Sequence, residues 1–239
     1  MQNRHMPLDF RPTMALMLPG TGSDADFVTR AFTEPLASRG IATVAVEPDP
    51  RRVVAGYLDA LDAAAEHERI IIGGVSIGAA VALQWASANP DRVVGVLAAL
   101  PAWTGAAADA PAAAGARFTA ARLRADGIEK VTAEMIASSP PWLGVELAKS
   151  WRSQWPHLPS ALDEAAEYRA PGVEDLEGIN VPVGIVAATD DAVHPLEVAH
   201  TWAGRLPQSN LVTVSLDQIG ADPATLGRES LRALSSMLP

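Results

Sequence analysis

The sequence predicts an α/β protein built on a doubly wound, mostly parallel sheet of about six strands. Three observations support this fold class. Strand-like and helix-like segments alternate along the chain. Several strand-like segments, such as residues 93–100, are apolar almost throughout, which is typical of strands covered on both faces. The 239 residues, 49% of them hydrophobic, suffice for one α/β domain that carries an insertion.

The elements are expected in a regular order. The predicted strands cover residues 13–18, 41–46, 70–73, 93–100, 183–188 and 211–215. The predicted helices cover residues 26–39, 51–66, 77–88, 195–206 and 222–238. Too few residues precede the first strand to form a hairpin before it, so we expect the strand order 2-1-3-4-5-6. In such a sheet, ligands bind beyond the carboxyl ends of the strands, where the first and third strands are neighbours.

The third strand runs into a G-x-S-x-G pentapeptide at residues 74–78, and a helix of small residues follows it. The two flanking glycines permit a sharp turn from strand to helix that lifts the Ser76 hydroxyl above the sheet. The start of the helix offers backbone N–H groups to a developing oxyanion. This context predicts that Ser76 is a nucleophile. The alternative is an ordinary glycine-rich turn between a strand and a helix.

Two further segments accompany this turn. One is the strand and glycine-rich loop at residues 14–22, and the other is the strand and loop at residues 181–195. In this order the three segments resemble the α/β-hydrolase family over nearly the whole chain. The resemblance implies an oxyanion hole formed by the backbone N–H groups of Thr21 and Ile77. A phosphate-binding loop is the other interpretation of residues 19–24, but the third glycine and the lysine of such loops are missing.

The resemblance also implies an acid after the fifth predicted strand. Asp191 stands four residues before Pro195, as the acid does in the family, and Asp190 is the alternative. Either carboxylate could instead cap the start of a helix. The family's histidine follows the last strand, where this chain has Ala221. The sequence therefore predicts a triad that lacks its usual base.

None of the five histidines lies between the last predicted strand and the last predicted helix, where the family has its base. His194 is the first choice for a substitute base, because it lies three residues from Asp191 at the expected catalytic edge. His157, in the inserted segment, is the second choice. We expect His67 to be solvated and His200 to be structural.

Residues 103–178 interrupt the alternation of strands and helices and hold four of the six tryptophans. The resemblance implies a helical cap in this segment, with residues 1–102 and 179–239 forming the core. Trp103 and Trp142 are the candidates for walls of an apolar substrate pocket. Ordinary packing between cap helices is the alternative role for these side chains.

Composition excludes several classes of function. The net charge of -10 argues against a nucleic-acid partner, because phosphate binding needs clustered Lys and Arg. The absence of cysteine excludes thiolate catalysis and Cys-based metal sites. No apolar run is long enough for a membrane span, and residues 1–12 do not resemble a secretory leader. We therefore expect a cytoplasmic protein without cofactor or metal, and without a membrane or nucleic-acid partner.

The function expected from these residues is hydrolysis of an ester, thioester or lactone of a small, partly apolar substrate. Two alternatives stay open because Ala221 replaces the usual histidine. One is a lyase or cyclase that uses Ser76 and the oxyanion donors without a complete triad. The other is a protein that binds a small molecule without converting it. Fold alone does not decide among the three.

Overall fold

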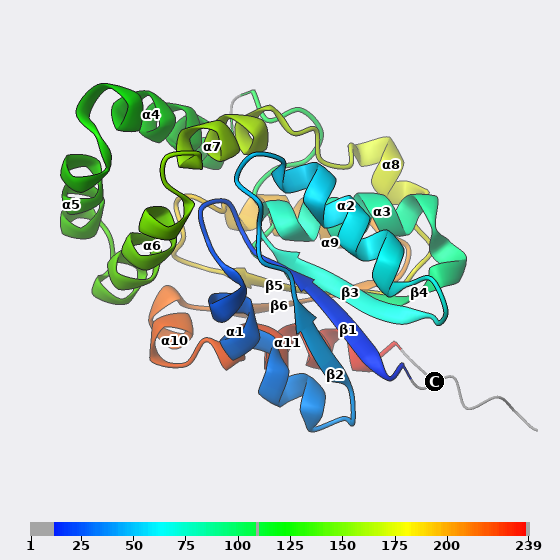
Figure 1. Ribbon diagram of the computed structural model, residues 1–239. Helices are drawn as coiled ribbons and strands as arrows, with labels where there is room; N and C mark the ends of the chain where they lie inside the picture. Colours follow the sequence, from blue (N-terminus) through cyan, green and yellow to red (C-terminus); the bar gives the residue numbers. More distant parts are fainter. Residues whose placement is uncertain (1–11, 109, 238–239) are drawn as a thin grey trace, which may run out of the picture.

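A computed structural model describes residues 12–108 and 110–237 and contains one six-stranded sheet in the order β2-β1-β3-β4-β5-β6 (Figure 1). Every neighbouring pair of strands is parallel. The strands are β1 (Met14–Leu18), β2 (Ala42–Ala45), β3 (Ile70–Val75), β4 (Val93–Ala99), β5 (Val183–Ala188) and β6 (Ser209–Val214). The predicted fold class, strand number and strand order are confirmed.

Helices cover both faces of the sheet, as a doubly wound fold requires (Figure 1). One face packs against α1 (Ala25–Ala37) and α11 (Ala224–Ser235), around a core that includes Phe32 and Leu234. The other face packs against α2 (Val53–Ala64), α3 (Ile77–Ala88) and α9 (Leu196–Arg205). The central strands β3 and β5 are buried along their whole length, which explains their continuous apolar sequence.

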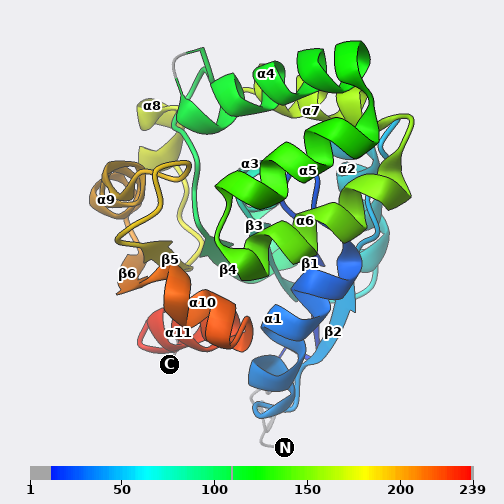
Figure 2. The same ribbon diagram turned by 90° about the vertical axis from the view of Figure 1, so that its left-hand side faces the viewer.

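The chain between β4 and β5 forms a layer of helices beyond the carboxyl ends of the strands (Figure 2). These helices are α4 (Pro111–Asp126), α5 (Ile128–Ser138), α6 (Pro141–Gln154) and α7 (Leu158–Glu167), and the short α8 (Val173–Glu177) follows them. Side chains from α4, α6 and α7, among them Leu123, Trp151 and Leu162, share a small hydrophobic cluster. This layer faces the part of the sheet where the sequence predicts the site.

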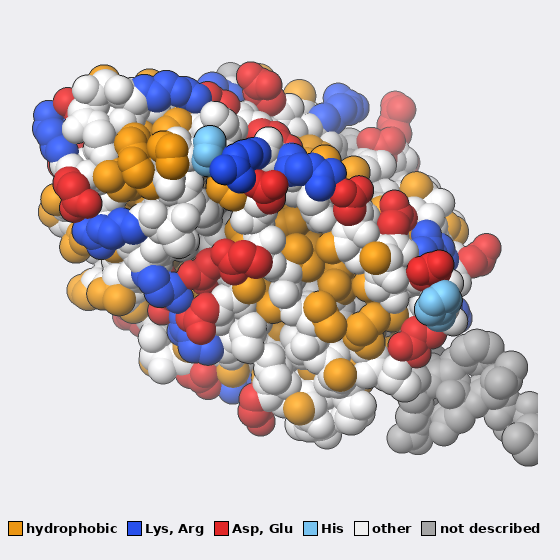
Figure 3. All heavy atoms as spheres, viewed as in Figure 1, with side chains coloured by type: hydrophobic (Ala, Val, Ile, Leu, Met, Phe, Trp, Pro, Cys, Tyr) orange, Lys and Arg blue, Asp and Glu red, His pale blue; other side chains and the backbone are white. Residues whose placement is uncertain are grey.

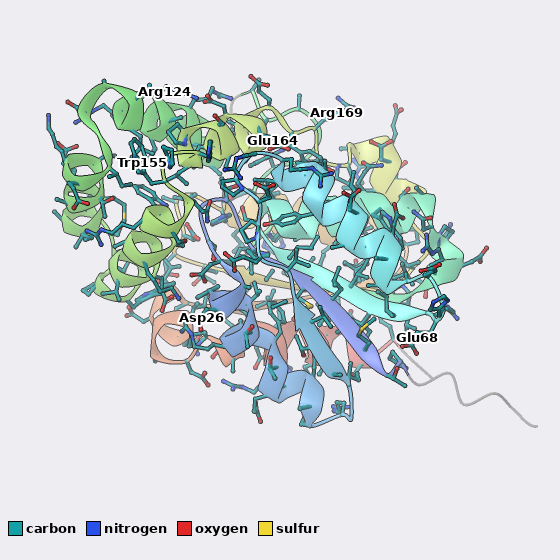
Figure 4. All side chains as sticks on the ribbon, in the orientation of Figure 1. Asp26, Glu68, Arg124, Trp155, Glu164 and Arg169 are labelled. Carbon is teal, nitrogen blue, oxygen red and sulfur yellow. The ribbon has the colours of Figure 1, made fainter. Side chains whose placement is uncertain are left out.

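Polar contacts tie the helical layer to the sheet domain. Glu164 of α7 accepts hydrogen bonds from the Val53 and Val54 N–H groups, both at 2.9 Å, at the start of α2. This carboxylate therefore satisfies N–H groups that have no partner within α2 itself and interacts favourably with the helix dipole. In Figure 4, Glu164 is labelled between α7 and the start of α2.

The turn after β6 differs from expectation. Residues 216–221, which lie between the predicted strand 211–215 and the predicted helix 222–238, form a short helix, α10 (Leu216–Ala221). Its start is a capping box, in which the Ser215 hydroxyl accepts from the Gln218 N–H and the Gln218 side chain accepts from the Ser215 N–H. The S-x-x-Q spacing that forms this cap was visible in the sequence.

Two expectations concern the ends of the chain and membranes. Residues 1–11, on which the expected lack of a secretory leader mainly rests, lie outside the described residues, as does the last residue of the predicted helix 222–238. Within residues 12–108 and 110–237, no helix combines the length and the hydropathy that a membrane crossing requires.

Candidate active site

A cavity of about 340 Å³ lies where the carboxyl ends of the strands meet the helical layer. The segments that follow β1, β3, β4, β5 and β6 all contribute to its wall, and residues of α4, α6 and α7 close it from the other side. This is the position at which open α/β sheets bind ligands. The candidate chemical groups enter it from the ends of three strands.

Ser76 stands between β3 and α3 with φ 55° and ψ -116°, a backbone conformation that side-chain-bearing residues rarely adopt. The adjacent glycines make this turn possible. A Cβ on Gly78 would lie 2.7 Å from the Pro19 carbonyl oxygen, and one on Gly74 would overlap the Leu18 carbonyl oxygen. The sharp turn holds the Ser76 side chain in the cavity wall, where the residue is 7% exposed.

His194 lies beside Ser76, although 118 residues separate them in the chain. Its Nε2 is 3.0 Å from Ser76 Oγ, and its Nδ1 is 2.7 Å from Asp191 Oδ2. An ionised carboxylate can only accept hydrogen bonds, so Nδ1–H of a neutral imidazole donates to Asp191. The lone pair of Nε2 is then directed at the serine, and the Ser76 hydroxyl donates to it. The three side chains form a continuous relay of hydrogen bonds.

Asp191 is held by its own loop. Its Oδ1 accepts from the N–H groups of Val193 at 2.8 Å and His194 at 3.2 Å, which leaves Oδ2 for the imidazole. Burial by itself would raise the pKa of this carboxyl. The hydrogen bond and charge of His194, together with the two backbone N–H groups, outweigh burial and lower the pKa below its ordinary value. The carboxylate therefore stays ionised at neutral pH.

The neighbouring candidate, Asp190, lies elsewhere. Its Oδ1 accepts from the Leu216 N–H at 2.8 Å, at the start of α10, and the residue is exposed. Asp190 thus holds the turn after β6, and it is Asp191 that contacts the imidazole.

Ala221, at which the family pattern would place the histidine, is exposed at the end of α10 and does not line the cavity. The cavity wall after β6 is formed by Leu216 and Ile219. Gly220 packs so closely on Trp142 of α6 that a Cβ there would overlap the indole ring.

The β1–α1 loop, residues 19–24, contributes Gly20, Thr21 and Ser23 to the cavity wall. A Cβ built on Gly20 would lie 3.6 Å from Ser76 Cβ, so the loop runs alongside the serine. Within the described chain, neither the Thr21 N–H nor the Ile77 N–H donates to another residue. Two backbone donors next to Ser76 are therefore free for a ligand, one from the loop and one from the start of α3.

The rest of the cavity wall is largely apolar. Trp103 and Trp142 both line it, as does Trp151, which the sequence analysis did not single out. Phe27 of α1 is a further aromatic contributor that sequence patterns did not indicate. Glu146 and Asp191 are the charged side chains among the described lining residues, and Glu146 is paired with Arg30 at 2.6 Å. The described residues contain no group of three His, Asp or Glu side chains placed to hold a metal ion.

The other described histidines lie away from the cavity. His157 precedes α7 and is not part of the cavity wall. His67 is exposed, as expected. His200 was expected to be structural, but the residue is exposed on the outer side of α9.

Comparison with known proteins agrees with the fold. The model of the alpha/beta hydrolase family matches residues 8–217. Among solved structures, Rv0554 of Mycobacterium tuberculosis is 14% identical with a TM-score of 0.72, over 97% of this chain and 93% of that one. An esterase from Thermogutta terrifontis is 18% identical with a TM-score of 0.64, over 84% of this chain and 80% of that one.

An enol-lactonase from Burkholderia xenovorans is 14% identical with a TM-score of 0.65, over 94% of this chain and 92% of that one. Among proteins of curated function, none matches the sequence significantly. At these identities the solved structures show a shared fold, and the family model covers most of the chain. The chain therefore belongs to the α/β-hydrolase family.

Proposed function

We propose that this protein is a serine hydrolase that cleaves a carboxylic ester, thioester or lactone. Ser76 is the nucleophile, His194 the general base and Asp191 the acid that orients it. The observation that carries the proposal is the pair of distances from His194, 3.0 Å to Ser76 Oγ and 2.7 Å to Asp191 Oδ2. A serine hydroxyl is a weak nucleophile unless a base within hydrogen-bond reach removes its proton.

The reaction proceeds in two balanced halves. In the first, Ser76 Oγ attacks the carbonyl carbon while His194 Nε2 takes its proton, and the oxyanion is bound by the Thr21 and Ile77 N–H groups. The imidazolium then returns the proton to the leaving alcohol, thiol or hydroxyl group, and an acyl-enzyme remains. In the second half, a water molecule attacks the acyl carbon by the same proton transfers, which releases the acid and restores Ser76.

The cavity supports an uncharged, apolar substrate. No Lys or Arg belongs to the described lining, so an anionic acyl group would find no counter-charge there. Its volume of about 340 Å³ and its walls of Trp103, Trp142 and Trp151 suit a small aliphatic or aromatic acyl chain. We propose that residues 103–178 act as a cap that shields the acyl chain of the substrate from water.

The alternatives of a lyase or of a binding protein were open because residue 221 is not a histidine. The position of His194 supports hydrolysis over both, since it supplies a base from a different loop. A binding protein would have no need for a serine in a strained backbone conformation hydrogen-bonded to an imidazole.

A fluorophosphonate probe and a series of p-nitrophenyl esters test the proposal. We expect the probe to label the wild-type protein at Ser76 and not to label Ser76→Ala. His194→Ala should lose both labelling and ester turnover, whereas His200→Ala, on the exposed side of α9, should keep both. Absence of labelling and of turnover on all esters in the wild type would refute the proposal.

A further inference from the structure

Helix α6 is joined to the β1–α1 loop by two buried side chains. Ser150 Oγ donates to the Gly22 carbonyl at 2.5 Å, and Gln154 Nε2 donates to the Ser23 carbonyl at 2.8 Å. The two residues are 1% and 4% exposed. They bridge segments that lie 128 and 131 residues apart in the chain.

The Ser150 contact is more than the usual bond of a serine within a helix. A helical serine commonly donates to a carbonyl three or four residues earlier. Those oxygens, of Leu147 and Glu146, lie 3.3 and 3.2 Å from Ser150 Oγ, farther than the Gly22 oxygen. The hydroxyl has one proton, and the shortest distance assigns it to the loop. The buried Ser150 hydroxyl thus bonds the β1–α1 loop rather than a carbonyl of its own helix.

The loop is held from both sides. Tyr57 of α2 donates from its buried hydroxyl to the Pro19 carbonyl at 3.0 Å. Burial raises the pKa of Tyr57, so this hydroxyl remains protonated and remains a donor. Four loop carbonyls thus have donors: Pro19 from Tyr57, Gly20 from the Ser23 N–H, Gly22 from Ser150 and Ser23 from Gln154. The Thr21 N–H lies between these carbonyls in the loop and donates to no other described residue.

Steric contact adds to these hydrogen bonds. Gly22 has φ +70°, and a Cβ there would lie 2.8 Å from Trp151 Nε1 of α6. The loop therefore packs directly against the helix at the residue that follows Thr21. Only glycine combines that backbone conformation with that close approach.

Ion pairs surround the buried contacts. Lys149 of α6 lies 3.1 Å from Asp24 and 2.7 Å from Asp26, and Arg30 of α1 lies 2.6 Å from Glu146 of α6. Figure 3 shows acidic and basic side chains mixed in the region between α6 and α1, and Figure 4 places Asp26 on α1 facing that region. The Lys149 and Arg30 side chains are 49% and 39% exposed, and ion pairs open to solvent in this way contribute little stability. The buried Ser150 and Gln154 therefore carry the positional constraint.

We propose that Ser150 and Gln154 are positioning residues for catalysis, which hold the Thr21 N–H at the oxyanion position only while α6 is docked on the β1–α1 loop. The proposal rests on the proposed serine-hydrolase function, since it assigns a use to the Thr21 donor. It makes the helical layer part of the catalytic apparatus as well as a cover. Displacing α6 would free two carbonyls and let the loop turn away from Ser76.

The expected consequence is a loss in kcat with little change in KM. The donor binds the oxyanion of the transition state, and the ground-state substrate gains little from it. Removing one oxyanion donor costs about 10²–10³ in kcat, and misplacing one costs part of that. We expect losses of about tenfold to a hundredfold for Ser150→Ala and for Gln154→Met, which keeps the shape of the glutamine side chain but removes its donor.

Two measurements test this proposal. Steady-state hydrolysis of p-nitrophenyl butyrate gives kcat and KM, and hydrogen–deuterium exchange of the peptide covering residues 19–28 reports the loop without requiring activity. Both variants should lower kcat and speed exchange in that peptide. The matched control is Ser153→Ala, on the same helix, whose hydroxyl donates to the Ser150 carbonyl and not to the loop. It should behave as the wild type.

Unchanged exchange in residues 19–28 for both variants would overturn the proposal, as would a rise in KM with constant kcat. Faster exchange with unaltered kcat would show that the loop is held but that its position does not serve catalysis, and this too would overturn it. If the wild type neither hydrolysed esters nor reacted with the fluorophosphonate, the hydrolase proposal would fail. The exchange data would still decide whether α6 holds the loop.

Discussion

Replacing Asp191 by asparagine tests whether the His194–Asp191 pair sets the protonation state of the base. The aspartate uses one oxygen, Oδ1, for the Val193 and His194 N–H groups and the other, Oδ2, for His194 Nδ1. Asparagine has one oxygen and one NH₂ group. Two backbone donors attract its oxygen, so the NH₂ group is directed at Nδ1.

An NH₂ group facing Nδ1 forces that nitrogen to accept, and the ring proton then moves to Nε2. The Nε2–H points at Ser76 Oγ and cannot remove its proton. A wrong tautomer of this kind lowers kcat by about 10⁴ in a Ser-His-Asp protease, which corresponds to about 5 kcal/mol in the activation barrier. We expect a loss of that order for Asp191→Asn, with KM changed only a few-fold because the carboxylate makes no required contact with an uncharged substrate.

The assay is steady-state hydrolysis of p-nitrophenyl butyrate by Asp191→Asn, His194→Ala and the double variant. The neighbouring substitution Asp190→Asn is the control, since Asp190 bonds the Leu216 N–H and not the imidazole. It should keep activity within a few-fold of wild type. Because one relay is being interrupted, the double variant should be no worse than His194→Ala. Activity of Asp191→Asn within tenfold of wild type, or losses that multiply in the double variant, would refute the reasoning.

Three further outcomes are expected. Gly78→Ala should abolish labelling of Ser76 by the fluorophosphonate and lower the melting temperature, because its Cβ would lie 2.7 Å from the Pro19 carbonyl oxygen; wild-type labelling would contradict this. Adding Ala221→His to His194→Ala should restore no esterase activity, since residue 221 does not line the cavity, and a measured recovery would show that the end of α10 reaches Ser76. The lowered pKa of Asp191 stabilises the fold above the ordinary carboxyl value of 3.8, and this contribution is lost as pH falls through the lowered pKa. Urea unfolding of the wild type and of Asp191→Asn should therefore give a difference in unfolding free energy that is constant above about pH 5 and shrinks below pH 3.8. A difference that grows on acidification would contradict this prediction.

The sequence by itself determined the sheet and the turn at Ser76. Continuous apolar runs separated by helical segments specify parallel strands covered on both faces. Successive side chains of a strand point to opposite faces of the sheet, so a strand is apolar at every position only where both faces are buried. Gly74 and Gly78 around Ser76 specify a turn that no other residue type allows, since the carbonyl oxygens of residues 18 and 19 leave no room for a Cβ. Both patterns depend on residues that are close together in the chain, so they can be recognised in the sequence.

The relation among the candidate catalytic side chains was decided by the tertiary structure. The spacing of Asp190 and Asp191 from Pro195 left both as candidates for the acid, and they separate only because the loop after β5 directs one to His194 and the other to α10. That His194 lies 3.0 Å from Ser76 depends on β3 and β5 being placed on either side of β4, and on how far the loop after β5 folds back over the sheet.

The contacts of α6 with the β1–α1 loop carry no sequence signal at all. Ser150 and Gln154 are ordinary polar residues of an amphipathic helix until Gly22 and Ser23 are brought beside them. The spacing of hydrophobic residues indicates which face of a helix is buried, but it does not indicate which backbone atoms that face contacts. Propensity and pattern act between near neighbours in the chain, whereas a hydrogen bond across 128 residues exists only after the chain has folded.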